Sequence, residues 1–194
     1  FKVKNEKIDL KIKNINIYNV LAALAVIKEF NLSLNNIKKI SKNFEPTEGR
    51  GTTHVIVRYN KKFKLIDESY NANPLSVKNA INGFNLIKKK KFKKYLILGD
   101  MLELGHKSEK YHKDLSKVIN NSNIDKVFIK GQKTLFTYKN LHKSKQGNIL
   151  QNKDDIDLVL SNIIKNNDYL MIKGSNATGL NNLSKKMIRG LNVI

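Results

Sequence analysis

The fold class of this chain is indicated by residues 95–129, YLILGDMLELGHKSEKYHKDLSKVINNSNIDKVFI. The apolar run over 95–98 predicts a short buried strand, and residues 108–119 carry the apolar spacing of a helix. A second strand is predicted over 126–129. Strands that alternate with helices in this way are typical of an α/β fold with a mostly parallel sheet.

The same alternation continues on both sides of this stretch. Residues 55–59 and 63–67 predict a hairpin around a turn at 60–62, and Pro74 suits the first position of a helix over 74–87. Downstream we predict helices at 133–141, 154–164 and 179–188, and strands near Ile149 and over 169–172. Upstream we predict a strand over 3–12 and helices over about 20–30 and 34–43. Between them, EPTEGRG at 45–51 interrupts every period with Pro and Gly, which predicts a domain boundary.

Composition excludes several classes of protein. The chain has 194 residues of which 40% are hydrophobic, and no apolar run approaches the roughly 20 residues that a membrane helix needs. The sequence contains no cysteine, which excludes disulfides and cysteine zinc sites and agrees with a reducing compartment. We therefore expect a cytoplasmic protein.

The net charge of +21 raises the alternative of a basic α/β module that binds nucleic acid or polyphosphate. Lysine rises together with asparagine and isoleucine along the whole chain, which favours a global compositional bias. The one dense block, KKKKFKK at 88–94, lies between a predicted helix and a predicted strand. We interpret this block as a solvated connection.

Candidate ligand-binding residues follow the predicted strands, because a parallel sheet binds ligands at the carboxyl ends of its strands. DESYNANP at 67–74 places two carboxylates, a phenol and two amides in one loop. Such carboxylates can accept hydrogen bonds from ribose, and amides beside a helix start suit a phosphate or carboxylate. In the alternative interpretation, Asn73 caps the helix and Asn71 shapes the turn.

Three further loops contain charged residues that could bind a ligand. Arg50, between Gly49 and Gly51, could present a guanidinium to a phosphate, or the segment could be a plain hinge. The acidic pair in GDMLELG at 99–105 could bind an ammonium or a metal, and KGS at 173–175 could bind an anion. The alternative for the acidic pair is that both are loop carboxylates with Leu102 and Leu104 packed underneath, and a simple strand-to-helix turn explains KGS equally well. The four histidines lack metal-ligand spacing, and the chain contains no P-loop motif.

Taken in order, these motifs resemble those of the Mur ligase family, in its D-alanyl-D-alanine-adding branch. The resemblance rests on Gly49-Arg50, DESYNANP at 67–74, LGDMLELG at 98–105, His112, and IKGS at 172–175. NIYNVLAA at 16–23 is similar to the family segment that closes the central ATPase domain, with Ile15 at the family's histidine position.

The resemblance implies that residues 1–45 are a remnant of the central ATP-binding domain and residues 46–194 a Rossmann-like C-terminal domain. The implied activity is an ATP- and Mg²⁺-dependent amide ligase that joins D-alanyl-D-alanine to UDP-N-acetylmuramoyl-tripeptide through an acyl phosphate. The P-loop and magnesium ligands would lie outside this chain, so no catalytic residue is assigned and the isolated chain is expected to be inactive. We expect a monomer without a nucleic-acid partner.

The family resemblance also implies roles for individual residues of this chain. The resemblance implies adenine contacts from Asn16 and Asn19, a phosphate contact from Arg50 and a ribose contact from Asp67, with Glu68 as the alternative. Asn71 is also assigned to ATP. The substrate-binding candidates are Tyr70, Asn73, Asp100, Glu103 and Lys173. A sibling amide ligase that uses another amino-acid donor is the competing enzyme hypothesis.

Overall fold

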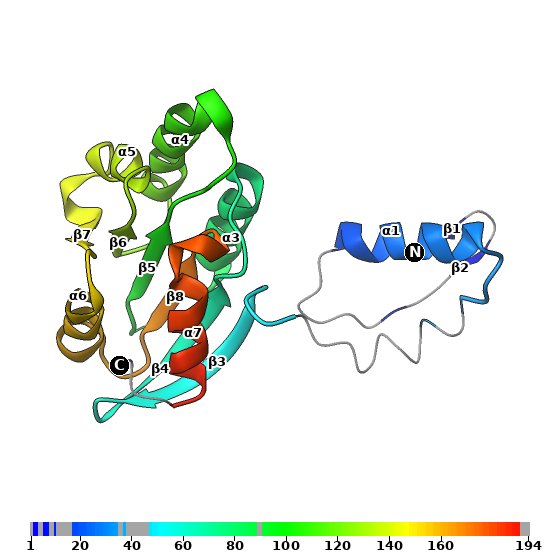
Figure 1. The fold of residues 1–194 in the computed structure, drawn as a ribbon. Helices are drawn as coiled ribbons and strands as arrows, with labels where there is room; N and C mark the ends of the chain where they lie inside the picture. The colour runs from blue at the N-terminus through cyan, green and yellow to red at the C-terminus, as the bar shows by residue number, and fades with distance from the viewer. Residues whose placement is uncertain are drawn as a thin grey trace. The chain divides into compact units, whose positions relative to one another are not determined.

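The computed structural model describes residues 2–3, 6–7, 10, 17–34, 37, 47–88 and 91–190. The chain divides into two units, residues 1–47 and residues 48–194, which are described in turn (Figure 1). None of the described helices is long and apolar enough to cross a membrane.

The first unit contains a small hairpin and one helix. Strand β1 (Lys2–Val3) pairs antiparallel with strand β2 (Glu6–Lys7), so the single strand predicted over 3–12 is wrong. Helix α1 (Ile17–Glu29) agrees with the predicted helix, and its Leu24 is buried together with Leu34. Most of the helix predicted over 34–43 lies outside the described residues.

The second unit is built on a six-stranded sheet. Its strands are β3 (Thr52–Arg58), β4 (Lys61–Glu68), β5 (Lys94–Gly99), β6 (Lys126–Lys130), β7 (Gln146–Ile149) and β8 (Tyr169–Lys173). They lie in the order β3-β4-β8-β5-β6-β7, and every neighbouring pair except β3 and β4 is parallel. The predicted fold class, an α/β fold with a mostly parallel sheet, is therefore confirmed.

The predicted hairpin at the sheet edge is also confirmed, with a tighter turn than expected. Arg58 pairs with Lys61, so the turn consists of only Tyr59 and Asn60. Both residues have positive φ, 52° and 56°, as two-residue hairpin turns require. The backbone twist of such a turn matches the right-handed twist of the two strands, so the strands are not splayed apart.

Helices cover both faces of this sheet. They are α3 (Pro74–Leu86), α4 (Ser108–Asn120), α5 (Thr134–Lys139), α6 (Lys153–Leu158) with a π-helical continuation over Val159–Ile163, and α7 (Leu180–Ile188). Helices α3 and α4 pack on one face, where their side chains surround Leu96 and Leu98. Helices α6 and α7 pack on the other face, over Ile97 and Ile172.

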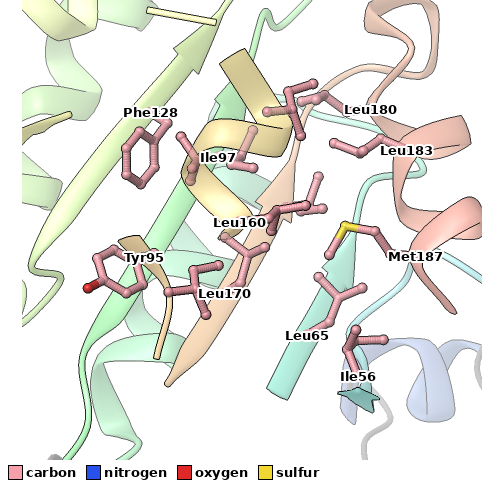
Figure 2. Close-up of a cluster of buried hydrophobic side chains, with 14 of the residues drawn as sticks. Ile56, Leu65, Tyr95, Ile97, Phe128, Leu160, Leu170, Leu180, Leu183 and Met187 are labelled. Carbon is pink, nitrogen blue, oxygen red and sulfur yellow. The ribbon is translucent and has the colours of Figure 1, made fainter. Parts of the chain in front are cut away.

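Figure 2 shows the core layer beneath α6 and α7, where strand side chains meet Leu160, Leu183 and Met187. Full burial of one such side chain contributes about 1.5–3 kcal/mol. Because the central strands are covered on both faces, their sequences are nearly continuous apolar runs, such as YLIL at 95–98.

The prediction that the lysine block at 88–94 is a solvated connection is wrong for Lys94. Lys88, Lys91 and Lys93 are exposed, but Lys94 is fully buried at the start of β5. Its ammonium donates to the carbonyl oxygens of Phe84 (2.8 Å) and Ile87 and to Asn123 Oδ1 (2.8 Å). Lys94 therefore donates to carbonyl oxygens at and just beyond the end of helix α3, where backbone acceptors lack full intrahelical pairing.

Candidate functional site

Several loops meet at one edge of the sheet. The parallel strands β4, β8 and β5 all end there, and β3 begins there because it runs antiparallel to β4, with Thr52 opposite Asp67. The segments involved are 48–51, 69–73, 100–104 and 174–178. The motifs singled out in the sequence therefore lie on neighbouring loops at the carboxyl edge, where α/β sheets bind ligands.

The segment before β3 is fastened to the loop after β4. Gly51 N–H donates to the carbonyl of Asp67 (2.7 Å), and Tyr70 N–H donates to the carbonyl of Gly49 (3.2 Å). Gly49 has φ of 79°, and a Cβ there would lie 2.8 Å from Tyr70 N. Only glycine therefore fits this approach.

Arg50 lies between these two fixed points. Its side chain is exposed, and its guanidinium carbon lies 4.6 Å from the centroid of the Tyr70 ring. Tyr70 itself is 43% exposed. The stacked pair presents a positive charge at the carboxyl edge while the ring limits the guanidinium's freedom.

The two acidic residues at the end of β4 have different environments. Asp67 is 1% exposed, and its Oδ1 accepts hydrogen bonds from Ser69 Oγ (2.6 Å) and Ser69 N–H (3.2 Å). The side chain of Glu68 is 25% exposed and lies beside Lys173, with Oε2 3.3 Å from Nζ. Glu68, not Asp67, is the carboxylate of this pair that reaches the surface.

Lys173 ends strand β8 with its side chain only 4% exposed. Its Nζ donates to the carbonyl of Asn71 (2.7 Å) and to Glu68 Oε2. Burial lowers the pKa of this ammonium, the Glu68 carboxylate opposes that change, and the positive charge of Arg50 adds to it. The positive charge of Lys173 is therefore used within the protein to hold the loop after β4.

The two asparagines of that loop differ in their partners. Asn73 caps helix α3: its Oδ1 accepts from Ser76 N–H (2.8 Å), while Ser76 Oγ accepts from Asn73 N–H (3.0 Å). This capping box confirms the structural alternative for Asn73 and the position of Pro74. Asn71 is exposed, and its Oδ1 accepts from Ala72 N–H (2.8 Å).

The two acidic residues after β5 also differ in burial, since Asp100 is half-buried and Glu103 is exposed. Asp100 Oδ1 accepts from Thr134 N–H (2.8 Å) at the start of α5, and a Cβ on Gly131 would lie 2.4 Å from this carboxylate. Glu103 is exposed and has a φ of 61°, which is uncommon for a residue other than glycine. Asp100 is half-buried and bonded within the protein, whereas Glu103 is exposed.

His112 supports this loop from helix α4. It is fully buried; its Nε2 accepts from Met101 N–H (3.0 Å) and its Nδ1 lies 2.8 Å from the carbonyl of Ser108. Nδ1 therefore carries the proton, and the imidazole is neutral. Burial lowers its pKa, against a smaller opposing effect of the Ser108 carbonyl.

The structure brings five of the predicted site residues together. Arg50, Glu68, Tyr70, Asn71 and Lys173 form one cluster at the carboxyl edge. Among the residues that the structure describes, no group of His, Asp or Glu side chains could hold a metal ion.

The predicted adenine contacts belong to the first unit. Asn19 is exposed on helix α1, and Asn16 lies outside the described residues. Both assignments stay predictions.

Comparison with known protein families identifies the class. The family model described as "Mur ligase, glutamate ligase domain" matches residues 53–176, which is more than half of the chain. The chain therefore belongs to the Mur ligase family.

One similar protein is named as a ligase that uses D-alanyl-D-alanine. A UDP-N-acetylmuramoyl-tripeptide–D-alanyl-D-alanine ligase from Bacillus subtilis is 30% identical over 183 residues, covering 89% of this chain. The chain spans only 38% of that relative's length.

Solved structures share the fold. MurF from Acinetobacter baumannii matches with a TM-score of 0.68 at 23% identity, over 89% of this chain and 37% of that one. A MurF ligase from Thermotoga maritima, solved in complex with ADP, matches with a TM-score of 0.66 at 20% identity, over 88% and 37%.

Proposed function

We propose that this chain is the C-terminal part of an ATP-dependent amide ligase that adds D-alanyl-D-alanine to UDP-N-acetylmuramoyl-tripeptide in the cytoplasm. In this proposal residues 46–194 form the C-terminal domain and residues 1–45 belong to the central ATP-binding domain. The observation that carries it is the cluster of Arg50, Glu68, Tyr70, Asn71 and Lys173 at the carboxyl edge of a Mur ligase fold. The D-alanyl-D-alanine ligase name of the Bacillus subtilis relative supports the choice of donor.

In the proposed reaction the tripeptide carboxylate takes the γ-phosphoryl group of ATP, releasing ADP and forming an acyl phosphate. The dipeptide amine then attacks the acyl carbon, loses a proton and displaces phosphate. A carboxylate attacks a polyanion in the first step, so nearby cations lower the barrier. Arg50 is suited to this task because its guanidinium is exposed and always charged.

We assign the ribose contact to Glu68 in preference to Asp67. A ligand-binding carboxylate must reach the surface, and Asp67 is buried with Oδ1 bonded to Ser69. Asp67 instead shapes the turn that sets Glu68 and Tyr70 in place. Asn71 remains an ATP-side candidate, and Asn16 and Asn19 remain candidates for adenine.

On the donor side, Glu103 is the best candidate to receive the ammonium end of the dipeptide, because its carboxylate is exposed. The exposed Tyr70 would line the space between nucleotide and dipeptide. Asp100, Lys173 and Asn73 bond within the protein, and we assign them to shaping these loops. We place the P-loop and magnesium ligands in sequence outside this chain.

The test is a reconstituted assay of the ligase that carries this chain, with MgATP, UDP-N-acetylmuramoyl-tripeptide and D-alanyl-D-alanine. Phosphate release should require all three substrates, and mass spectrometry should detect the tripeptide extended by the dipeptide. Matched reactions replace the dipeptide with alanine, glutamate or diaminopimelate. Equal or faster turnover with one of these donors would assign the chain to a sibling ligase.

A further inference from the structure

The loop after β8 lies between the two loops that carry the candidate site residues. This follows from the strand order, because β8 pairs with β4 on one side and with β5 on the other. Two glycines let β5 and β8 approach closely where they end. A Cβ on Gly174 would lie 3.0 Å from Gly99 Cα, and one on Gly99 would lie 3.3 Å from Gly174 Cα.

Ser175 connects all three loops. Its backbone N–H donates to the carbonyl of Asp100 (3.0 Å). Its hydroxyl accepts from Leu102 N–H (3.0 Å) and donates to the carbonyl of Ala72 (3.3 Å). Ser175 is 5% exposed, so water does not readily replace these partners.

We propose that Ser175 is a positioning residue for the ligase reaction: its hydroxyl fixes the distance between the loop at 69–73 and the loop at 100–104. This inference rests on the proposed function, in which the first loop faces ATP and the second faces the dipeptide. An amine attacks an acyl phosphate efficiently only when the two are held in register. Ser175 touches neither substrate in this account and acts through the two loops.

The chemistry of the position explains why a hydroxyl is needed. One group must accept a hydrogen bond from an N–H and donate one to a carbonyl, and a hydroxyl does both. Alanine would leave Leu102 N–H and the Ala72 carbonyl without these partners. Threonine keeps the hydroxyl and adds one methyl group.

The first experiment measures amide hydrogen exchange on this chain without substrates, in Ser175→Ala and in the matched control Ser184→Ala. Ser184 is also buried, but its hydroxyl has no hydrogen-bond partner within the described part of the chain. Exchange at Leu102 should be about tenfold faster in Ser175→Ala, with the amide of Leu96 in β5 unchanged. Equal exchange at Leu102 in both variants would show that the Ser175 hydroxyl does not hold the loop at 100–104, and would overturn the proposal.

The second experiment measures kinetics of the ligase that carries this chain. Ser175→Ala should lower kcat about tenfold, keep the KM for ATP within about twofold, and be rescued by Ser175→Thr. If the wild type is active and Ser175→Ala matches Ser184→Ala in kcat, the role of Ser175 is wrong. If the wild type forms no dipeptide product, the proposed function itself is wrong, and the role of Ser175 falls with it.

Discussion

Acidic residues that lie close together in this sequence have different roles, and the difference follows from their burial. Asp67 is buried and Asp100 is half-buried, and each accepts hydrogen bonds from the protein, whereas Glu68 is half-buried beside Lys173 and Glu103 is exposed. A buried carboxylate is tolerated only when its oxygens have partners. The internal member of each pair therefore shapes a loop, and the outer member remains available to a ligand.

This division gives a first prediction for the ligase that carries the chain. Glu68→Gln removes the charge but keeps an oxygen that can accept from Lys173. We expect the KM for ATP to rise about tenfold with little change in kcat, because a contact made equally in ground and transition states is lost. Steady-state kinetics measure both constants. A change confined to the KM for D-alanyl-D-alanine would refute the ribose assignment.

His112 gives a prediction about pH. Its folded pKa lies below the ordinary value of 6.5, so below pH 6.5 the unfolded chain binds more protons than the folded one. The contribution of His112 to stability should be complete above pH 6.5 and be lost as pH falls toward the folded pKa. A protonated ring also cannot accept from Met101 N–H.

The measurement is urea unfolding between pH 7.5 and pH 5.5, compared between the wild type and His112→Gln. The wild type should lose more unfolding free energy across this window, since glutamine does not titrate. Parallel curves for the two proteins would show that His112 is not the titrating group.

At the scale of single residues, the sequence predicts which loops meet at the carboxyl edge but not the direction of each side chain. The capping role of Asn73 can be predicted from sequence because helix capping depends on local spacing. The choice between Asp67 and Glu68 could not be made from sequence, because it depends on Ser69 and on Lys173, which is distant in the chain. The connecting role of Ser175 depends on strand order, which no local pattern encodes.

At the scale of elements, the strands and helices of the second unit follow the predicted pattern because apolar periodicity decides them. The lysine block at 88–94 is the instructive exception. A run of lysines indicates a solvated connection, yet Lys94 is buried where its ammonium meets the carbonyl oxygens at the end of α3. The acceptors at the end of this neighbouring helix, together with Asn123 Oδ1, make the burial favourable.

Lys94 therefore provides a stability prediction with a matched neighbour. Lys94→Met keeps the length of the side chain but leaves the carbonyls of Phe84 and Ile87 without their ammonium donor. We expect a loss of about 2–4 kcal/mol in unfolding free energy. Lys93→Met, at an exposed side chain, should change it by no more than about 0.5 kcal/mol. Urea denaturation that ranks the two variants equally would contradict the assigned role.

At the scale of the whole molecule, our proposal places the nucleotide at the carboxyl edge of the sheet, where α/β folds bind ligands. The charge of +21 raises the competing expectation that anions bind wherever lysines gather. Exposed lysines such as Lys62, Lys93 and Lys165 lie at or near the amino ends of strands, away from Arg50 and Glu68. The two accounts therefore predict different locations for a bound nucleotide on the same sheet.

An amide-resolved NMR titration of this chain with MgATP separates them directly. We expect weak binding, no tighter than about micromolar, because the proposed phosphate-binding loop lies outside the chain. Shift changes should centre on Arg50 and on residues 68–73. Changes confined to Lys62, Lys93 and Lys165, or sub-micromolar binding, would contradict the account.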